Sequence, residues 1–174
     1  METADLLFIA AFLLTGTSYL VHTVAHLRES RSPHEEDSDL FLSVIVAAGY
    51  AGWTAMLFLD PVRLSIPDIA TYAGGILGAG GLLLMIAAER TKGGVSRGDT
   101  LVTTGVYRWV RHPMYAGIIL MHIGFPIFFR ALVTLLSAAF WIPLILIWRY
   151  WEEAELEERF GDVYRKYREK RPWF

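Results

Sequence analysis

Apolar stretches divide the first half of the chain into segments long enough to cross a membrane. Residues 6–27, 40–59 and 66–88 each contain at most one Asp, Glu, Lys or Arg, and a helix of about 20 apolar residues spans the hydrocarbon core of a bilayer. The charged segment 28–39 and the Asp60-Pro61 pair lie between them and are typical of loops. The pattern therefore predicts three membrane-spanning helices within residues 1–90.

The second half, residues 91–174, begins with a polar, glycine-rich segment at 91–111. The apolar tract 114–148 follows, and only Arg130 interrupts it. A single helix of that length would hold Arg130 deep in the bilayer, which is costly. We therefore expect a helical hairpin that turns near Phe129-Arg130, with a short fourth span and a fifth. After Arg149, the charged and aromatic tail predicts an amphipathic helix on the membrane surface.

These elements predict an all-α, polytopic membrane protein of about five transmembrane helices, forming one domain over residues 1–174. The composition agrees, because 54% of the residues are apolar and only 20% are charged. The chain has no cysteine, which excludes disulfides and thiolate metal sites. A formal net charge of −2 gives no basic field for nucleic acid. A cleaved secretory signal is disfavoured, because Glu2 and Asp5 precede a long apolar run.

The distribution of basic residues predicts the orientation. In the five-span arrangement, Arg63 and Arg130 lie on one side, and the other 14 of the 16 Lys and Arg residues lie on the opposite side. Basic loops remain in the cytoplasm. The sequence thus predicts a multi-pass protein with its N-terminus outside and its C-terminal tail in the cytoplasm.

Small and titratable residues within the spans have both structural and functional interpretations. The spacing of Gly74 and Gly78 predicts close helix packing, because a phosphate-binding glycine loop would follow a strand. His22 and His26 have the spacing of a two-histidine metal site. Since no third ligand is near, we interpret them as interfacial or pocket-lining residues. His122, inside the fourth span, is a functional candidate or the partner in an interhelical hydrogen bond.

Two polar segments flank the predicted hairpin. Arg111 and His112 precede Pro113, so an anionic group could meet both side chains and the free amides of a proline-started helix. The alternative is an ordinary helix start at a basic interface. Glu152 and Glu153 follow the fifth span, and carboxylates accept two hydrogen bonds from diols such as ribose hydroxyls. A solvated helix face is the alternative.

The combination of these segments is more specific than either one. The first motif reads G-x-Y-x-x-x-R-H-P-x-Y-x-G from Gly105, and the second reads E-E-x-x-L-x-x-x-F-G-x-x-Y-x-x-Y from Glu152. With a helical hairpin between them, they resemble the isoprenylcysteine carboxyl methyltransferase family and its phospholipid methyltransferase relatives. The resemblance covers residues 101–174, whereas the first three spans match only in being hydrophobic.

The resemblance implies that residues 91–174 bind S-adenosylmethionine, in a pocket formed by the RHPxY and EExxL segments. The expected cofactor-binding residues are Tyr107, Arg111, His112, Pro113, Tyr115, Gly117, Glu152 and Glu153. Of these, His112, Tyr115 and Gly117 are assigned to the methionine portion, and Glu152 or Glu153 to ribose or amino contacts. Pro113 initiates the helix. No metal is expected.

The expected acceptor is a lipophilic molecule that enters from the bilayer and carries a prenylcysteine-type carboxylate. Methyl transfer is an in-line displacement, and a carboxylate acceptor needs a cation to align it. Arg149 is the candidate for this catalytic role, and Arg108 and Arg90 are weaker ones. In the alternative, a phospholipid amine N-methyltransferase, the amine would have to lose a proton, and Glu153 or His122 would be its general base.

Two further classes of protein are weighed against a methyltransferase. Membrane sterol reductases, which use a nicotinamide dinucleotide, resemble this C-terminal architecture. Their motif typically has Asn at the position of Met114 and an acidic residue at the position of Ile118, so the sequence here favours the methyltransferases. A membrane scaffold without activity is the third alternative.

Overall fold

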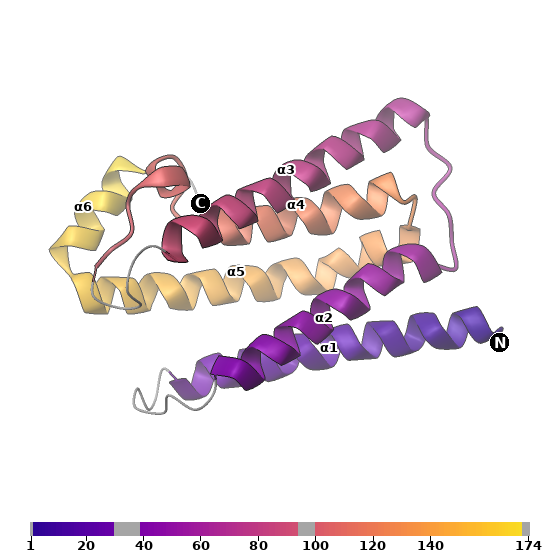
Figure 1. Cartoon of the computed structure of the whole chain (residues 1–174), viewed down its shortest axis with the longest axis horizontal. Helices are drawn as coiled ribbons and strands as arrows, with labels where there is room; N and C mark the ends of the chain where they lie inside the picture. Colours follow the sequence, from indigo (N-terminus) through magenta and orange to yellow (C-terminus); the bar gives the residue numbers. More distant parts are fainter. Residues whose placement is uncertain (1, 30–38, 94–99, 172–174) are drawn as a thin grey trace.

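The computed structural model describes residues 2–29, 39–93 and 100–171, and these residues form helices with short connections. In chain order the helices are α1 (Thr3–Glu29), α2 (Asp39–Leu59), α3 (Asp68–Gly93), the 3-10 helix η2 (Gly105–Arg108), α4 (Pro113–Phe128), α5 (Leu132–Phe160) and α6 (Asp162–Lys170). The long α5 lies between the α1–α2 pair and the α3–α4 pair (Figure 1). The loops predicted at 28–39 and 91–111 fall partly outside the described ranges.

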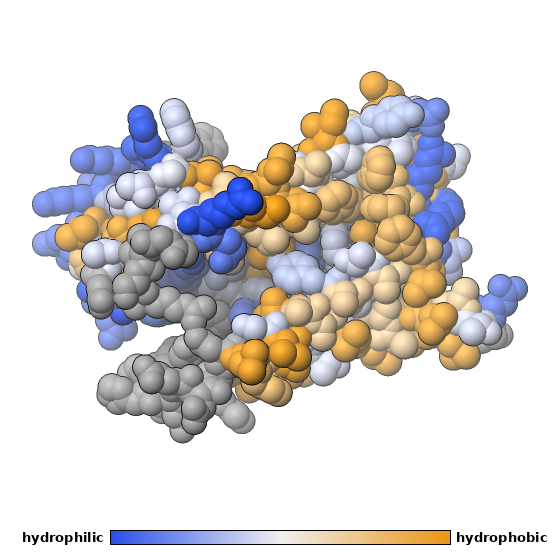
Figure 2. Space-filling view, viewed as in Figure 1, coloured by the Kyte–Doolittle hydropathy of each residue, from blue (hydrophilic) through white to orange (hydrophobic). Residues whose placement is uncertain are grey.

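The helices confirm the predicted all-α architecture of about five spans. Within the described residues, α1, α2, α3 and α5 are long and apolar enough to cross a membrane, and α4 is a shorter apolar helix. Apolar side chains cover the middle of the molecule, whereas hydrophilic ones gather at its two ends, one of which is the end where α6 lies (Figure 2). Outward-facing apolar residues include Ile69 and Ile76, which are 78% and 76% exposed. Such a surface suits contact with lipid.

Glycines bring α3 and α4 into close contact. A Cβ atom added to Gly78 would lie 2.7 Å from the ring of Phe125, and one added to Gly74 would lie 2.9 Å from the carbonyl oxygen of Gly124. Gly124 is closer still, because its Cβ would lie 2.2 Å from the backbone nitrogen of Gly78. The predicted packing role of Gly74 and Gly78 is confirmed.

The α4–α5 hairpin turns where the sequence predicts it, and α4 is the short helix of the pair. Arg130 lies between the two helices with φ of 56°, a left-handed conformation that allows the tight turn. Its carbonyl accepts a hydrogen bond of 2.7 Å from the amide of Leu64, and the amide of Leu132 donates one of 3.0 Å to the carbonyl of Val62. The turn is therefore bound to the α2–α3 connection.

Asp60 and Arg63 fasten this turn. The buried carboxylate of Asp60 accepts hydrogen bonds of 2.7 Å from both the amide and the hydroxyl of Thr134, so it caps the first turn of α5. The Arg63 guanidinium donates to the carbonyls of Phe58, at the end of α2, and Phe129, at 2.8 and 3.0 Å. These contacts fix the starting point of the helix that carries Glu152 and Glu153.

One predicted boundary was wrong. The fifth span was expected to end at Arg149 and give way to a separate surface helix, but α5 continues without a break to Phe160. Residues 149–159 contain no glycine or proline that would stop a helix. The break falls at Gly161, whose φ of 50° is accessible to glycine. Only residues after it form the separate helix α6. For α3 the predicted and observed bounds differ by a few residues. The span was expected at 66–88, and the helix begins after Pro67 and extends to Gly93.

Helix α6 folds back toward η2. The Tyr167 hydroxyl donates a 2.6 Å hydrogen bond to the carbonyl of Tyr107, and the Arg171 guanidinium donates to the carbonyl of Arg108. Tyr164 is 1% exposed. The tail is thus packed against the segment that contains the first motif.

Candidate active site

The first motif begins α4. His112 is the N-cap residue and Pro113 occupies the first turn, which confirms the proline-started helix. His112 is buried, and its carbonyl accepts a hydrogen bond of 3.0 Å from the amide of Ala116. Gly105 opens η2 with φ of 56°, and a Cβ atom there would lie 2.6 Å from the hydroxyl of Thr91. A glycine is therefore required for η2 to approach the end of α3.

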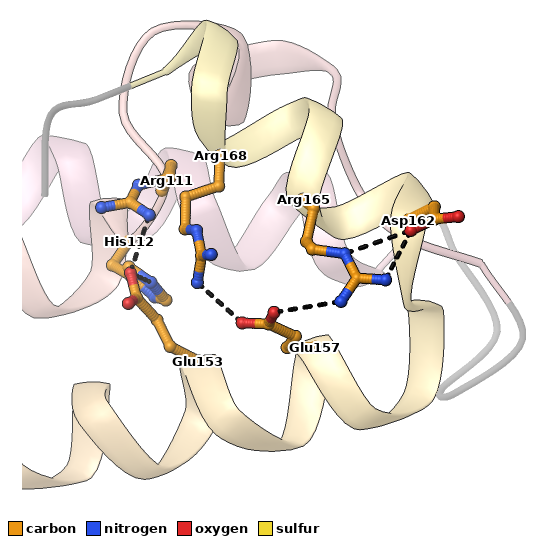
Figure 3. Close-up of polar contacts among 7 residues, drawn as sticks. All are labelled: Arg111, His112, Glu153, Glu157, Asp162, Arg165 and Arg168. Carbon is orange, nitrogen blue, oxygen red and sulfur yellow. Dashed lines mark hydrogen bonds and ion pairs between the residues drawn. The ribbon is translucent and has the colours of Figure 1, made fainter.

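The second motif meets the first at His112. Its Nε2 atom lies 3.0 Å from Oε1 of Glu153, and its Nδ1 atom lies 3.6 Å from Oε2 of Glu152. Arg111 Nη1 also lies 3.0 Å from Oε1 of Glu153, at ion-pair distance although not in hydrogen-bond geometry. Figure 3 shows Arg111 and His112 both directed at Glu153. The structure therefore brings together two adjacent pairs of residues, Arg111-His112 and Glu152-Glu153, whose members His112 and Glu153 are 41 positions apart in sequence.

Beside this cluster lies a cavity of about 490 Å³. Its walls come from the four helices α1, α2, α4 and α5 and from the end of α3. The described lining residues are Ser18, Tyr19, His22, Val46, Tyr50, Lys92, Met114, Tyr115, Ile118, Trp148, Glu152 and Glu155. Tyr115 and Glu152 are the predicted site residues that line it. Arg111, His112 and Glu153 are not among the described lining residues, and of these three His112 contacts Glu152.

The cavity combines aromatic rings with charge. Three tyrosines and a tryptophan contribute aromatic surface, and α5 contributes the carboxylates of Glu152 and Glu155. Lys92, from the last turn of α3, places its Nζ atom 3.4 Å from Oε1 of Glu152. Aromatic faces and carboxylates together attract organic cations such as sulfonium and ammonium groups. The site is therefore suited to a ligand with both apolar and cationic parts.

A second set of polar atoms lies where η2, α4 and α6 meet. The hydroxyls of Tyr107 and Tyr164 and the Nε atom of Arg111 are buried without a hydrogen-bond partner among the described residues. Burial raises the pKa of Tyr107 and raises that of Tyr164 to about 12, so both phenols keep their protons near neutral pH. Unsatisfied buried donors are costly. These three groups are available to donate hydrogen bonds to a ligand.

Helix α6 is held to the end of α5 by Glu157. The Arg168 guanidinium donates a 2.7 Å hydrogen bond to this carboxylate, and Arg165 lies 3.6 Å from it and also pairs with Asp162 (Figure 3). The hydrogen bond to Asp162 raises the pKa of Arg165. These contacts keep Tyr164 close to the cluster around His112.

The histidines of the spans have two different surroundings. His122 Nδ1 donates a hydrogen bond of 2.9 Å to the carbonyl of Ile118, because a carbonyl can only accept. Its other ring nitrogen, Nε2, therefore accepts a hydrogen bond of 2.9 Å from the Tyr19 hydroxyl. The ring of Trp53 stacks on His122 at 4.6 Å. His122 thus makes the predicted interhelical hydrogen bond. His22 lines the cavity as a pocket residue, with its ring edge on Trp148. The side chain of His26 lies outside the described part.

Two predicted site residues have other surroundings. Gly117 faces α3, where an added Cβ atom would lie 2.5 Å from the carbonyl oxygen of Gly81, so packing accounts for this glycine. Arg149 is half-buried on α5, next to Trp148 but not among the described residues that line the cavity. Its catalytic role stays a prediction. No group of three or more His, Cys, Asp or Glu residues in the described ranges is placed to hold a metal ion.

Sequence reasoning missed several of the cavity residues. In the sequence, nothing distinguishes three of them from other residues of apolar spans: Tyr19, Tyr50 and Trp148. Lys92 resembles the other basic residues of the loops. Glu155 has a weak signal, because it lies one helical turn after Glu152 and so shares its face. Only the packing of the helices around the cavity reveals the others.

The matches to known proteins include the same C-terminal segments. A family model described as phospholipid methyltransferase matches residues 72–163. The protein-S-isoprenylcysteine O-methyltransferase of Schizosaccharomyces pombe is 32% identical over 94 residues, which cover 51% of this chain and 36% of that protein. The Homo sapiens protein of the same name is 33% identical over 79 residues, which cover 42% of this chain and 26% of that protein. The chain thus matches well under half the length of these relatives. No solved structure matches.

Proposed function

Because this chain belongs to the phospholipid methyltransferase family, we propose that it is an S-adenosylmethionine-dependent methyltransferase whose acceptor is a lipid-like molecule with a prenylcysteine-type carboxylate. The two curated relatives, both named protein-S-isoprenylcysteine O-methyltransferase, support this acceptor. The observation that carries the proposal is the position of His112. It joins Glu152 and Glu153 at the wall of an aromatic, acidic cavity.

The residues present fit the cofactor. S-adenosylmethionine contains a sulfonium, an amino acid group, a ribose diol and an adenine ring, and when bound it supplies an electrophilic methyl group. Glu152 and Glu155 are acceptors for ammonium or diol protons, and the aromatic walls suit the sulfonium and the adenine. The buried Nε of Arg111 and hydroxyl of Tyr164 are donors suited to a carboxylate.

The chain's own residues would align the reactants and exclude water. Tyr115 and Glu152 would contact the cofactor directly, while His112 and Glu153 would hold Glu152 in place. Arg149 is our candidate for orienting the acceptor carboxylate, because it lies within one turn of Glu152 and Glu153 on α5. Alignment and replacement of water by fixed polar groups are the main contributions that such a displacement requires.

A phospholipid amine acceptor is the second candidate. The description of the matching family model favours it, and so do the carboxylates of Glu152 and Glu155 in the cavity, which would attract an ammonium head group. In that reaction the ammonium must lose a proton before methylation, and Glu153 is the candidate base. His122 is less suited, because both of its ring nitrogens already bond within the protein.

The protein is an integral membrane protein by its family and its long apolar helices. We propose that the ends of α3 and α5, with α6, face the cytoplasm, which the distribution of basic residues supports. The water-soluble cofactor would then arrive from the cytoplasm and the lipid from the bilayer.

Calorimetric titration of the detergent-solubilised protein with S-adenosylhomocysteine tests the proposal. We expect binding in the wild type, and a loss of affinity of about tenfold to a hundredfold in His112→Ala and Glu153→Ala, because each removes a charge-assisted hydrogen bond. Glu152→Gln, which removes a charge from the cavity wall, should weaken binding as well. Glu158→Ala is the matched control, since this exposed carboxylate lies on the same helix but is not among the described residues that line the cavity.

Unchanged affinity in all three site variants would refute the assignment of the cofactor to this cavity. Stabilisation of the wild type by a nicotinamide dinucleotide instead of S-adenosylhomocysteine would indicate a reductase. Stabilisation by neither would favour a scaffold without activity. Transfer of a labelled methyl group to a prenylcysteine analogue or to phosphatidylethanolamine then distinguishes the two acceptors.

A further inference from the structure

Charge is distributed unevenly around the cavity. Both of its carboxylates come from α5, whereas Lys92, at the end of α3, is the only lysine or arginine among the lining residues that the structure describes. None of the three arginines considered from the sequence, Arg90, Arg108 and Arg149, is among these lining residues. Lys92 is therefore the permanently charged cation among the described lining residues of the cavity.

Lys92 is only loosely held by its ion pair. The distance of 3.4 Å to Glu152 is long for a charge-assisted hydrogen bond, and 42% of the Lys92 side chain is exposed. Glu152 has a second partner in His112, at 3.6 Å. Because the Lys92 side of the pair is partly exposed, the pair contributes little stability. An anionic ligand group can thus take over the ammonium without leaving Glu152 isolated.

The helix end supplies an alternative reason for a lysine at this position. Cations stabilise the negative end of the helix dipole, and Arg90 lies in the same last turn of α3. Arg90 is exposed and lies outside the cavity lining, so it provides that interaction without facing the cavity. Lys92 instead faces Glu152, so the helix end does not account for its orientation into the cavity.

We propose that Lys92 is a specificity-determining residue that binds the anionic group of the methyl acceptor, and that acceptors without such a group bind poorly. The inference rests on the proposed function, because it takes the cavity as the place where the acceptor head group lies. The anionic oxygens belong either to a carboxylate, as in a prenylcysteine, or to the phosphodiester of an aminophospholipid. Lys92 would recognise both through the same charge-assisted hydrogen bond.

Binding in the absence of cofactor tests this directly. Tryptophan fluorescence is a suitable signal, because Trp148 lines the cavity. The detergent-solubilised full chain is titrated with two matched pairs that differ in one anionic group: N-acetyl-S-farnesylcysteine against its carboxamide, and a short-chain phosphatidylmethanol against the corresponding diacylglycerol. We expect the wild type to prefer the anionic member of one pair by about fivefold to tenfold, the effect of one partly exposed charged hydrogen bond.

Lys92→Ala should abolish that preference, and Lys92→Arg should retain most of it. Lys166→Ala is the control, because it removes the same side chain from an exposed position of α6. The pair that shows the Lys92-dependent preference identifies the source of the anionic group. Equal preference in wild type and Lys92→Ala, or no preference in either pair, would overturn the proposal.

The cofactor also contains a carboxylate, and a second titration separates it from the acceptor. S-adenosylhomocysteine should bind Lys92→Ala as tightly as it binds the wild type. A weaker affinity would assign Lys92 to the cofactor and overturn its role in acceptor specificity. A wild type that binds no S-adenosylhomocysteine but still shows the Lys92-dependent preference would refute the proposed methyltransferase function alone.

Discussion

The α3–α4 contact should not tolerate a single added methyl group at Gly124. A Cβ atom at this position would lie 2.2 Å from the backbone nitrogen of Gly78 and 2.7 Å from the carbonyl oxygen of Gly74. Ordinary van der Waals contacts begin at 3.4 Å. Because both neighbours are backbone atoms, no change of side-chain rotamer relieves the clash. The helices would have to separate by about 1 Å, which loosens the whole contact.

Overpacking of this kind costs about 1–3 kcal/mol, and the backbone clash places Gly124→Ala toward the upper end of that range. For a chain of this length, such a cost lowers the melting temperature by about 5–10 °C. Gly80→Ala is the matched control on α3, because a Cβ atom there has no heavy atom within 4 Å. Alanine also favours helix more than glycine does. Its melting temperature should therefore be unchanged or slightly higher.

Thermal unfolding of both variants in the same detergent, followed by circular dichroism, provides the measurement. Gly124→Ala should also weaken S-adenosylhomocysteine binding, because a displaced α4 carries His112 away from Glu153. Equal melting temperatures for Gly124→Ala and the wild type would refute the close backbone contact. Equal losses in Gly124→Ala and Gly80→Ala would indicate a general intolerance of the membrane helices to alanine.

Three further predictions concern the turn, the acceptor and the topology. Asp60→Ala should lower the free energy of unfolding by about 1–3 kcal/mol, because the buried hydrogen bonds from Thr134 to the Asp60 carboxylate are lost. Asp68→Ala, which removes an exposed ion pair, should lower it by about 1 kcal/mol or less. Equal losses for the two variants in denaturant titrations would contradict the capping role of Asp60. Arg149→Lys should raise the KM for the acceptor in a labelled-methyl assay, since lysine lacks the planar fork; full turnover with an unchanged KM would identify Arg149 as a helix anchor. Reporter fusions after Phe174 and within residues 60–66 should face opposite sides of the membrane; a common side would exclude five spans.

Much of the fold follows from local patterns in the sequence. The hairpin could be predicted because Arg130 interrupts a tract too long for one span, and the structure has the turn at that residue. The boundary predicted at Arg149 was wrong, because it was placed from a change in polarity alone. A change from apolar to charged residues marks where a helix leaves lipid, but it does not end the helix, and α5 continues until Gly161. Polarity and helix termination are separate signals.

The candidate site was only partly predictable. Spacing within each motif places His112 at a helix start and Glu152 and Glu153 on one helix, but their contact depends on how α4 packs against α5. Gly117 illustrates the opposite problem, because a glycine inside a motif can serve the packing of α3 rather than a ligand. A motif identifies a region of the site, and tertiary structure assigns the role of each residue within it.

The two halves of the chain contribute differently to the cavity. The matched family region, residues 72–163, supplies Lys92, Tyr115 and Glu152, together with the buried cluster behind them. Tyr19 and Tyr50, from α1 and α2, complete the wall from outside that region. A shared cofactor requires shared contacts, whereas the wall formed by α1 and α2 can differ from one protein to another without disturbing them. Acceptor choice should therefore depend on α1 and α2 together with Lys92, so a relative's substrate follows from resemblance only if these residues also correspond.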